Sequence, residues 1–186
     1  EPVKSLTDWV SEQDTGGRQL SGIAGKVVLG LCVAWSLFQL WYASPLPFLL
    51  GKGILNDTEA RSLHLGVALL LGFICFPMLR GKSRRALPWY DLVLAFVGAF
   101  AGAYFLLFYN ELATRPGKPI LQDIVIATAG LACLLEATRR AVGTPMVVLA
   151  LLFLAYTMLG RYMPDVIAHK GASLERMLSH QWLTTE

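Results

Sequence analysis

Five long apolar stretches, almost free of charged residues, constrain this chain more than any other feature of its sequence. Four of them are clear, and they cover residues 27–44, 62–79, 92–110 and 141–160. A helix needs roughly 20 mostly apolar residues to cross the hydrocarbon core of a bilayer, which is about 30 Å thick. Each of the four stretches has about that length. The chain is therefore predicted to cross a membrane at least four times.

The remaining stretch, fourth in chain order, is shorter. It is uncharged only from residue 124 to residue 135, between Asp123 and Glu136. A run of that length is typical of a buried or re-entrant helix. If the helix extends from Ile120 to Thr138, it reaches roughly 28 Å at about 1.5 Å per residue. We predict that this stretch also crosses the membrane.

The distribution of Lys and Arg over the predicted loops supports five crossings. Nine basic residues fall in the N-terminal segment and in the loops after the second and fourth stretches: Lys4, Arg18, Lys26, Arg80, Lys82, Arg84, Arg85, Arg139 and Arg140. The alternate loops carry four, which are Lys52, Arg61, Arg115 and Lys118. Short cytoplasmic loops are enriched in such residues. Five crossings with a cytoplasmic N-terminus place all nine on the cytoplasmic side.

The composition excludes most other classes of protein. Hydrophobic residues make up 55% of the 186 residues and charged residues 16%, whereas soluble domains have about 45–50% and about 25%. A small soluble domain buries only about 70% of its unfolded surface, so it could not hide this much apolar area. Disordered, collagen-like and disulfide-rich chains have different compositions. The predicted fold class is an all-α integral membrane protein.

The two ends of the chain are more polar than the membrane segments. Residues 1–25 are predicted to form a cytoplasmic tail, and apolar residues at positions 6–10 leave a short interfacial helix or a loose terminus as alternatives. Residues 161–186 are predicted to lie on the opposite, outer side of the membrane. Within them, Ser173 is a predicted N-cap of an amphipathic surface helix. Its apolar residues recur at helical spacing, and they are Leu174, Met177, Leu178 and Trp182.

Few residues in the sequence could support catalysis or cofactor binding. The tripeptide at 81–83 matches only the end of a phosphate-binding loop, without the first glycine or a preceding strand, so it is interpreted as a basic turn. The three cysteines are interpreted as apolar filler, each alone in its helix. Ser62 and His64 point to different sides of a helix and cannot form a catalytic pair. We predict no enzyme activity, no catalytic, cofactor-binding or metal-binding residue and no nucleic-acid partner.

Polar residues within membrane helices are the usual place to look for a transport path. Gln39, His64, Glu136 and Arg139 are the candidates here, and helix packing is the alternative role for each of them. Glu136 precedes Arg139 and Arg140 by three and four residues, a spacing that favours ion pairs at a helix end. These residues do not form a chain of ionisable groups across the bilayer.

Small residues provide a clearer pattern. Gly98 and Gly102 form a GxxxG motif in the third stretch, and Gly66 and Gly72 lie in the second. Small side chains allow membrane helices to approach closely, because lipid removes the hydrophobic drive for their association. We predict that these four glycines are sites of helix packing.

Several short segments, taken in order, resemble one family of transporters. The segments are Arg61-x-x-His64-Leu65, Phe76-Pro77, Leu87-Pro88-Trp89-Tyr90-Asp91, Leu135-Glu136-Ala137-Thr138-Arg139-Arg140, Ser173-Leu174-Glu175-Arg176-Met177-Leu178-Ser179-His180 and Leu183-Thr184-Thr185-Glu186. Their order and spacing are similar to the N-terminal part of the fused permeases of tripartite ATP-independent periplasmic (TRAP) transporters of the TAXI type. The resemblance covers about residues 26–186.

The resemblance implies a small-subunit region, at residues 26–140, joined by a linking helix at 141–160 to a large elevator-type subunit. It implies that residues 161–186 contain the first part of an arm bracing that subunit. The partners implied are the large subunit, fused or separate, a periplasmic substrate-binding protein and membrane lipids. Uptake of organic acids such as dicarboxylates or glutamate would be driven by Na⁺ or H⁺, at sites in the large subunit.

Two other functions stay open from the sequence alone. One is a stand-alone membrane assembly or adaptor protein, and the other is an autonomous small carrier. In the family that the chain resembles, the substrate site follows the region matched here, so the chain is expected to be either a separate subunit or a fragment of a fused permease. The function predicted from the sequence is that of a membrane scaffold, which holds a moving transport domain without carrying solute itself.

Overall fold

The computed structural model describes residues 17, 18, 20–78 and 87–183. Within them, five helices are long and apolar enough to cross a membrane. They are α2 (Gly22–Ala43), α4 (Asp57–Cys75), α5 (Trp89–Leu107), α7 (Leu121–Ala141) and α8 (Thr144–Leu159), whose membrane-length segment continues to Tyr162. Shorter helices are α3 (Leu46–Leu50), α6 (Tyr109–Ala113), η1 (Gly160–Tyr162) and α9 (Leu174–Trp182). The described part contains no strand, so the predictions of an all-α fold and of five helices long enough to span a membrane are confirmed.

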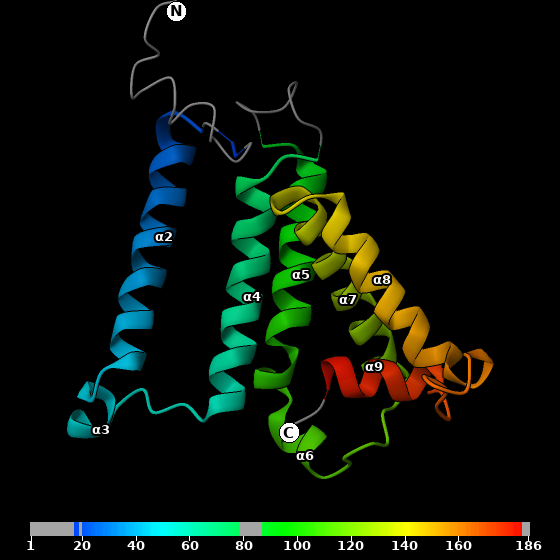
Figure 1. Ribbon diagram of the computed structural model, residues 1–186. Helices are drawn as coiled ribbons and strands as arrows, with labels where there is room; N and C mark the ends of the chain where they lie inside the picture. Colours follow the sequence, from blue (N-terminus) through cyan, green and yellow to red (C-terminus); the bar gives the residue numbers. More distant parts are fainter. Residues whose placement is uncertain (1–16, 19, 79–86, 184–186) are drawn as a thin grey trace, which may run out of the picture.

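Each long helix runs opposite to the one before it (Figure 1). The end of the molecule where α4 and α7 finish, and where α5 and α8 begin, is called here the Arg140 end. The opposite end, which holds α3, α6 and α9, is called the α9 end. The predicted interfacial helix near positions 6–10, the basic loop residues from Arg80 to Arg85 and the tripeptide at 81–83 lie outside the described residues.

The helix limits follow from local chemistry, and α4 and α2 begin well before the stretches expected for them. A reciprocal capping box begins α4: Glu59 N donates to Asn56 Oδ1 at 2.7 Å, and Asn56 N donates to Glu59 Oε2 at 2.9 Å. This cap starts the helix five residues before the apolar run, because a capped turn tolerates polar residues. Similarly, α2 begins at Gly22, inside the predicted tail, as Ile23 and Ala24 continue its apolar sequence.

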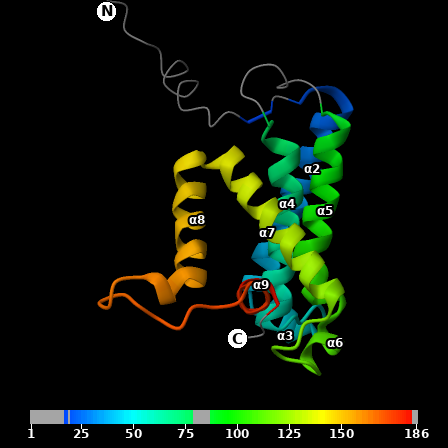
Figure 2. The ribbon, with the colours of Figure 1, turned by 90° about the vertical axis from the view of Figure 1, so that its right-hand side faces the viewer.

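A tight connection separates α7 from α8. Gly143 has a φ of 116°, which side chains other than that of glycine rarely allow, and Pro145 lies in the first turn of α8. The chain therefore reverses within a few residues, and α7 and α8 diverge from this point (Figure 2). The predicted fourth crossing is a full-length helix, although its uncharged core is short.

The packed core lies among α4, α5 and α7. One group of buried residues, Leu69, Phe73, Ile74, Ala95 and Cys133, joins these three helices toward the Arg140 end. A second group joins α5, α6, α7 and α9 toward the other end, and it includes Tyr104, Phe105, Ala127, Met177 and Leu178. In contrast, α2 and α8 contain no buried residue. The described chain thus has a three-helix core and two outlying helices.

The predicted amphipathic helix is present as α9, and it lies across the ends of the long helices (Figures 1 and 2). Its N-cap is Ser173, as predicted, whose Oγ accepts a hydrogen bond from Arg176 N at 3.2 Å. The apolar residues Met177 and Leu178 are buried against the protein's own helices, whereas the prediction placed this face on the membrane surface. Leu174 alone of the predicted apolar face is exposed.

Trp182 explains why α9 packs on protein. Its indole Nε1 donates to the carbonyl oxygen of Ala101 on α5 at 2.9 Å. Its ring lies against Gly130 on α7, where a Cβ atom would be 2.2 Å from the nearest ring carbon. The indole therefore fills a notch that exists because residue 130 has no side chain. This contact fastens α9 to the core.

Candidate functional site

The predicted packing glycines lie where α4 and α5 meet. Gly66, Gly98 and Gly102 form what we call the glycine seam. A Cβ atom on Gly102 would lie 2.6 Å from the backbone nitrogen of Gly66, and one on Gly98 would lie 3.2 Å from Leu69 Cβ. Gly72 faces α7 instead, where an added Cβ atom would lie 3.8 Å from the Cβ of Ala137. The seam brings two backbones into direct contact, as small residues permit in membranes.

Ser62 completes this seam with two hydrogen bonds across it. Its Oγ donates to the carbonyl oxygen of Gly102 at 2.7 Å and accepts from Leu106 N at 3.2 Å. His64 bonds elsewhere, on another face of α4. The buried hydroxyl therefore ties α4 to α5, and its lone pairs and proton are engaged in packing contacts.

A cluster of buried charges lies at the Arg140 end. Asp91, in the first turn of α5, is fully buried. Arg140 Nη1 donates to Asp91 Oδ1 at 2.7 Å, and Arg18 Nη2 donates to Asp91 Oδ2. All three side chains are withdrawn from solvent. One carboxylate therefore connects α5, α7 and the segment before α2.

Glu136 extends this cluster along the last turn of α7. Its carboxylate accepts from Arg139 Nε and Nη2, both at 2.8 Å, and from Arg140 Nε at 2.7 Å. The ion pairs predicted from the i+3 and i+4 spacing are therefore confirmed. Arg139 is partly exposed, whereas Arg140 is buried and makes the contact with Asp91. The name "ionic clamp" is used below for Arg18, Asp91, Glu136, Arg139 and Arg140.

The ionic clamp also caps the end of α4. The last carbonyl groups of a helix have no partner within it and carry partial negative charge. Arg18 Nη1 donates to the carbonyl oxygens of Phe73 and Ile74 at 3.1 and 3.0 Å. Arg140 Nη1 reaches the carbonyl oxygen of Phe76 at 3.3 Å. Three guanidinium groups thus bind two carboxylates and the end of α4 at once.

Burying this many charged groups requires desolvation, which costs free energy. Moving charges out of water costs several kcal/mol per ion, and each must be offset by close partners. Arg140 is 5% exposed, its guanidinium carbon lies 4.9 Å from the centre of the Phe73 ring, and its Nη2 has no hydrogen-bond partner among the described residues. Removal of Asp91 would take the carboxylate partner from the buried Arg18 and leave Arg140 with Glu136 alone, so the clamp favours one arrangement of the helices.

A second buried aspartate lies at the α9 end. Asp123, in the first turn of α7, accepts from Tyr104 Oη at 2.7 Å, from Arg115 Nη2 at 3.1 Å and from the backbone of Ile120 at 3.0 Å. Asp123 is fully buried, and the Arg115 side chain is 24% exposed. These contacts fix the start of α7 against α5 and the loop before it.

The structure brings two of the predicted polar candidates together. Gln39 Nε2, on α2, lies 2.8 Å from His64 Nδ1, on α4. The ring of Trp35 lies 5.3 Å from that of His64 and stacks on Phe38. This polar pair links α2 to α4 toward the α9 end, whereas Glu136 and Arg139 lie at the Arg140 end. The four candidates therefore belong to two separate places.

Two of the cysteines, each alone in its own helix, lie close together in the fold. The thiols of Cys32 on α2 and Cys75 at the end of α4 lie next to each other. Cys133 is buried separately on α7. The sequence left open whether the cysteines converge, because helix spacing alone does not fix which faces meet. The described residues include no group of three or more His, Cys, Asp or Glu side chains suited to a metal ion.

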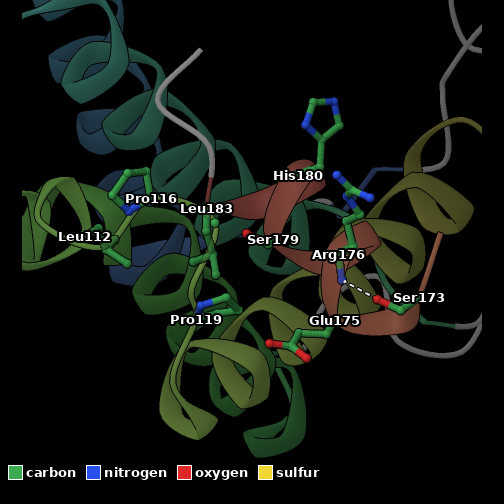
Figure 3. Close-up of a pocket in the computed structure, with 10 residues that line it drawn as sticks. Leu112, Pro116, Pro119, Ser173, Glu175, Arg176, Ser179, His180 and Leu183 are labelled. Atoms are coloured by element: carbon green, nitrogen blue, oxygen red, sulfur yellow. Dashed lines mark hydrogen bonds between the residues drawn. The ribbon is translucent and has the colours of Figure 1, made fainter.

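A cleft of about 510 Å³ lies between α9 and the loop that precedes α7. We call it the α9 cleft, and its lining is Leu112, Pro116, Gly117 and Pro119 from the loop side, and Ser173, Glu175, Arg176, Ser179, His180 and Leu183 from the α9 side. Figure 3 shows that Arg176 and His180 project to the same side of α9, away from Glu175. The volume lies within the range of small-ligand pockets.

Sequence reasoning missed the most buried charged groups. Asp91 and Asp123 each lie in the first turn of an apolar helix. An isolated acidic residue at that position could have been predicted to pair with an arginine at the end of a neighbouring helix. The partners Arg18 and Tyr104 are 73 and 19 residues away from their aspartates, and no local pattern connects them. The α9 cleft was likewise not foreseen, because it depends on how α9 docks.

Comparisons with protein-family models, with curated proteins and with solved structures found no match to this chain.

Proposed function

We propose that this chain is the fixed membrane scaffold of a secondary transporter, holding a separate or fused domain that carries the solute. The observation that supports this most strongly is the position of the buried charges. Among the described residues, Asp91, Asp123 and Arg140 are the charged residues buried as a whole, and each lies in the first or last turn of a helix. The buried Arg18 side chain joins them from the segment before α2. They act as anchors at the two ends rather than as steps on a path through the membrane.

The packing between these anchors suits a part that stays still. The glycine seam joins backbone to backbone, and Ser62 adds hydrogen bonds across it. Interlocked helices of this kind have one preferred arrangement, because sliding them would drive backbone atoms into each other. A moving domain needs the opposite, a smooth surface to move against.

The two outlying helices offer such surfaces. Neither α2 nor α8 buries a residue within the described chain, and both are predominantly apolar. A helix that is hydrophobic all round is suited to lipid or to another membrane domain. In our proposal, residues 26–140 act as the four-helix small-subunit part, α8 as the linking helix and residues 161–186 as the beginning of an arm.

The remaining parts of the proposal follow from the likeness to TRAP permeases. The N-terminus is cytoplasmic, the Arg140 end lies on that side, and the membrane is a bacterial inner membrane. A periplasmic binding protein docks on the outer loops around 52–61 and 111–118 and delivers an organic acid. The gradient of Na⁺ or H⁺ acts on the large subunit.

Uptake assays test the proposal in the native cell. Deletion of residues 26–160 with the large transport subunit retained should abolish uptake of the organic acid, and uptake should return when the chain is supplied again. Normal uptake after the deletion would contradict the scaffold function. Saturable flux into liposomes that contain this chain alone would indicate an autonomous carrier, and purification without a transporter subunit would favour an adaptor.

A further inference from the structure

We propose that the α9 cleft binds the phosphate group of a membrane phospholipid, in the leaflet at the α9 end. The cleft is large enough for a head group at about 510 Å³, and it lies between a loop and a helix that crosses the ends of the membrane helices. This site is independent of the proposed scaffold function, because it rests on the cleft and its lining alone.

The lining favours an anion. Arg176 supplies a guanidinium group, His180 an imidazole and Ser179 a hydroxyl, all on the α9 side of the cleft. Arginine binds phosphate with two parallel hydrogen bonds, and such charge-assisted bonds are about twice as strong as neutral ones. Glu175 is the one carboxylate of the lining, and it projects away from Arg176 and His180 (Figure 3).

A recess beneath the cleft contains a further unsatisfied donor. The recess has a volume of about 10 Å³, shares six lining residues with the cleft and is also lined by Arg115 and Asp123. Arg115 Nε is buried there without a hydrogen-bond partner among the described residues. The carboxylate of Asp123 already accepts three hydrogen bonds, one of them from the Arg115 guanidinium, so its negative charge is neutralised within the protein. A space of this size holds about one water molecule, which could link Arg115 Nε to an anion in the cleft.

The surroundings favour a lipid over a soluble anion. Leu121, two residues after the cleft-lining Pro119, is 77% exposed, and Val125, one turn further along α7, is 59% exposed. Leu174, at the start of α9, is 54% exposed. Acyl chains can lie along this apolar stripe while the phosphate occupies the cleft. Basic pockets between membrane helices bind lipid head groups on the cytoplasmic side of membranes, and we infer the same chemistry for the α9 cleft in the other leaflet.

Lipid binding to the purified chain in detergent tests the proposal. The probe is a phosphatidylglycerol, added in increasing amounts and counted by native mass spectrometry. Arg176→Gln should weaken its binding about tenfold, the usual effect of losing a charge-assisted hydrogen bond. Arg176→Lys should retain much of the binding. The matched control is Arg61→Gln, an exposed cation at the same end paired with Asp57, which should leave binding unchanged.

Two further probes distinguish the source of the phosphate. Diacylglycerol with the same acyl chains lacks the phosphate and should not bind at the site, and inorganic phosphate lacks the chains and should not displace the lipid. Equal loss of binding in Arg176→Gln and Arg61→Gln, or tight binding of diacylglycerol, would overturn the site. Displacement by inorganic phosphate would overturn the lipid assignment. Unfolding temperatures measured without lipid show whether the variants are folded, and a folded Arg176→Gln variant with unchanged lipid binding contradicts the proposal.

Discussion

The two ends of the helix core differ in how they neutralise a buried aspartate. Each has a fully buried aspartate in the first turn of a helix, Asp91 on α5 and Asp123 on α7. Asp91 is matched by arginines from two distant segments. Asp123 is matched by a tyrosine, a backbone N–H three residues away and a partly exposed arginine. The first arrangement joins segments far apart in sequence, whereas the second mainly fixes the local entry into α7.

The comparison shows how a membrane protein can limit the cost of buried charge. At the α9 end the partners of Asp123 include a partly solvated arginine and a neutral hydroxyl group, so little charge is withdrawn from water. Loss of this aspartate therefore leaves fewer buried charges without a partner. At the Arg140 end, three arginines depend on two carboxylates and on the end of α4. Removal of one partner of a buried ion pair leaves an uncompensated charge, which is the more costly event.

Asp91→Asn is therefore expected to have the largest effect on stability. The amide keeps the shape of the side chain, but it removes the carboxylate partner of Arg18 and leaves Arg140 with Glu136 alone, so the free energy of unfolding should fall by about 3–5 kcal/mol. Denaturation of the purified chain in mixed detergent measures this change. Asp57→Asn, at an exposed ion pair with Arg61, is the matched control and should cost less than about 1 kcal/mol. Equal effects of the two substitutions would refute the ionic clamp.

The glycine seam should give the next largest effect. Gly102→Val places side-chain atoms where a Cβ already lies 2.6 Å from the backbone of Gly66, and we expect a loss of about 3 kcal/mol from overpacking. Gly72→Ala is the control, because its Cβ would meet Ala137 at 3.8 Å, an ordinary contact. That variant should be neutral or slightly more stable, because alanine favours helix. The same unfolding assay compares them, and a tolerated valine would show that α4 and α5 are not closely packed.

Asp123→Asn should cost less than Asp91→Asn. The amide can still accept from Tyr104, and Arg115 can turn toward water because it is partly exposed. A loss of about 2 kcal/mol is expected, as for one weakened buried hydrogen-bond group. Tyr104→Phe combined with Asp123→Asn in a double-mutant cycle measures how much of this loss belongs to their hydrogen bond. If Asp123→Asn proved as harmful as Asp91→Asn, the contrast between the two ends would be wrong.

The contact of α2 with the core should be the weakest of the four. Gln39→Leu removes the hydrogen bond to His64, and hydrogen bonds between membrane helices average about 0.6 kcal/mol. Ser36→Ala is the matched control, since the Ser36 hydroxyl donates to the carbonyl oxygen of Cys32 on its own helix. Unfolding measurements should separate the two variants by no more than about 1 kcal/mol. A loss as large as that of Asp91→Asn would place α2 within the core.

Much of the fold was predictable because the bilayer imposes strong rules on sequence. Length and apolarity identified five crossing segments, and spacing alone identified the pairs of Glu136 with Arg139 and Arg140. The cap at Ser173 followed from its position before an amphipathic repeat. These features depend on residues within a few turns of one another, so the sequence displays them directly.

The candidate site was less predictable because its contacts join distant segments. Trp182 fits against Gly130 only when α9 crosses the ends of α5 and α7. No sequence pattern around either residue predicts this contact. The same holds for Arg18 with Asp91 and for Cys32 beside Cys75. The capping box at Asn56 and Glu59 was readable, and attention to it would have placed the start of α4 correctly.

Distances between spin labels test the central claim, that α4, α5 and α7 form one fixed body and α2 does not. With the native cysteines replaced by alanine, labels at the exposed positions Val93 and Val125 report α5 against α7, and labels at Val93 and Leu31 report α5 against α2. Pulsed electron paramagnetic resonance in lipid nanodiscs should give a narrow distance distribution for the first pair and a broader one for the second. A distribution between α5 and α7 as broad as that between α5 and α2 would contradict the fixed core.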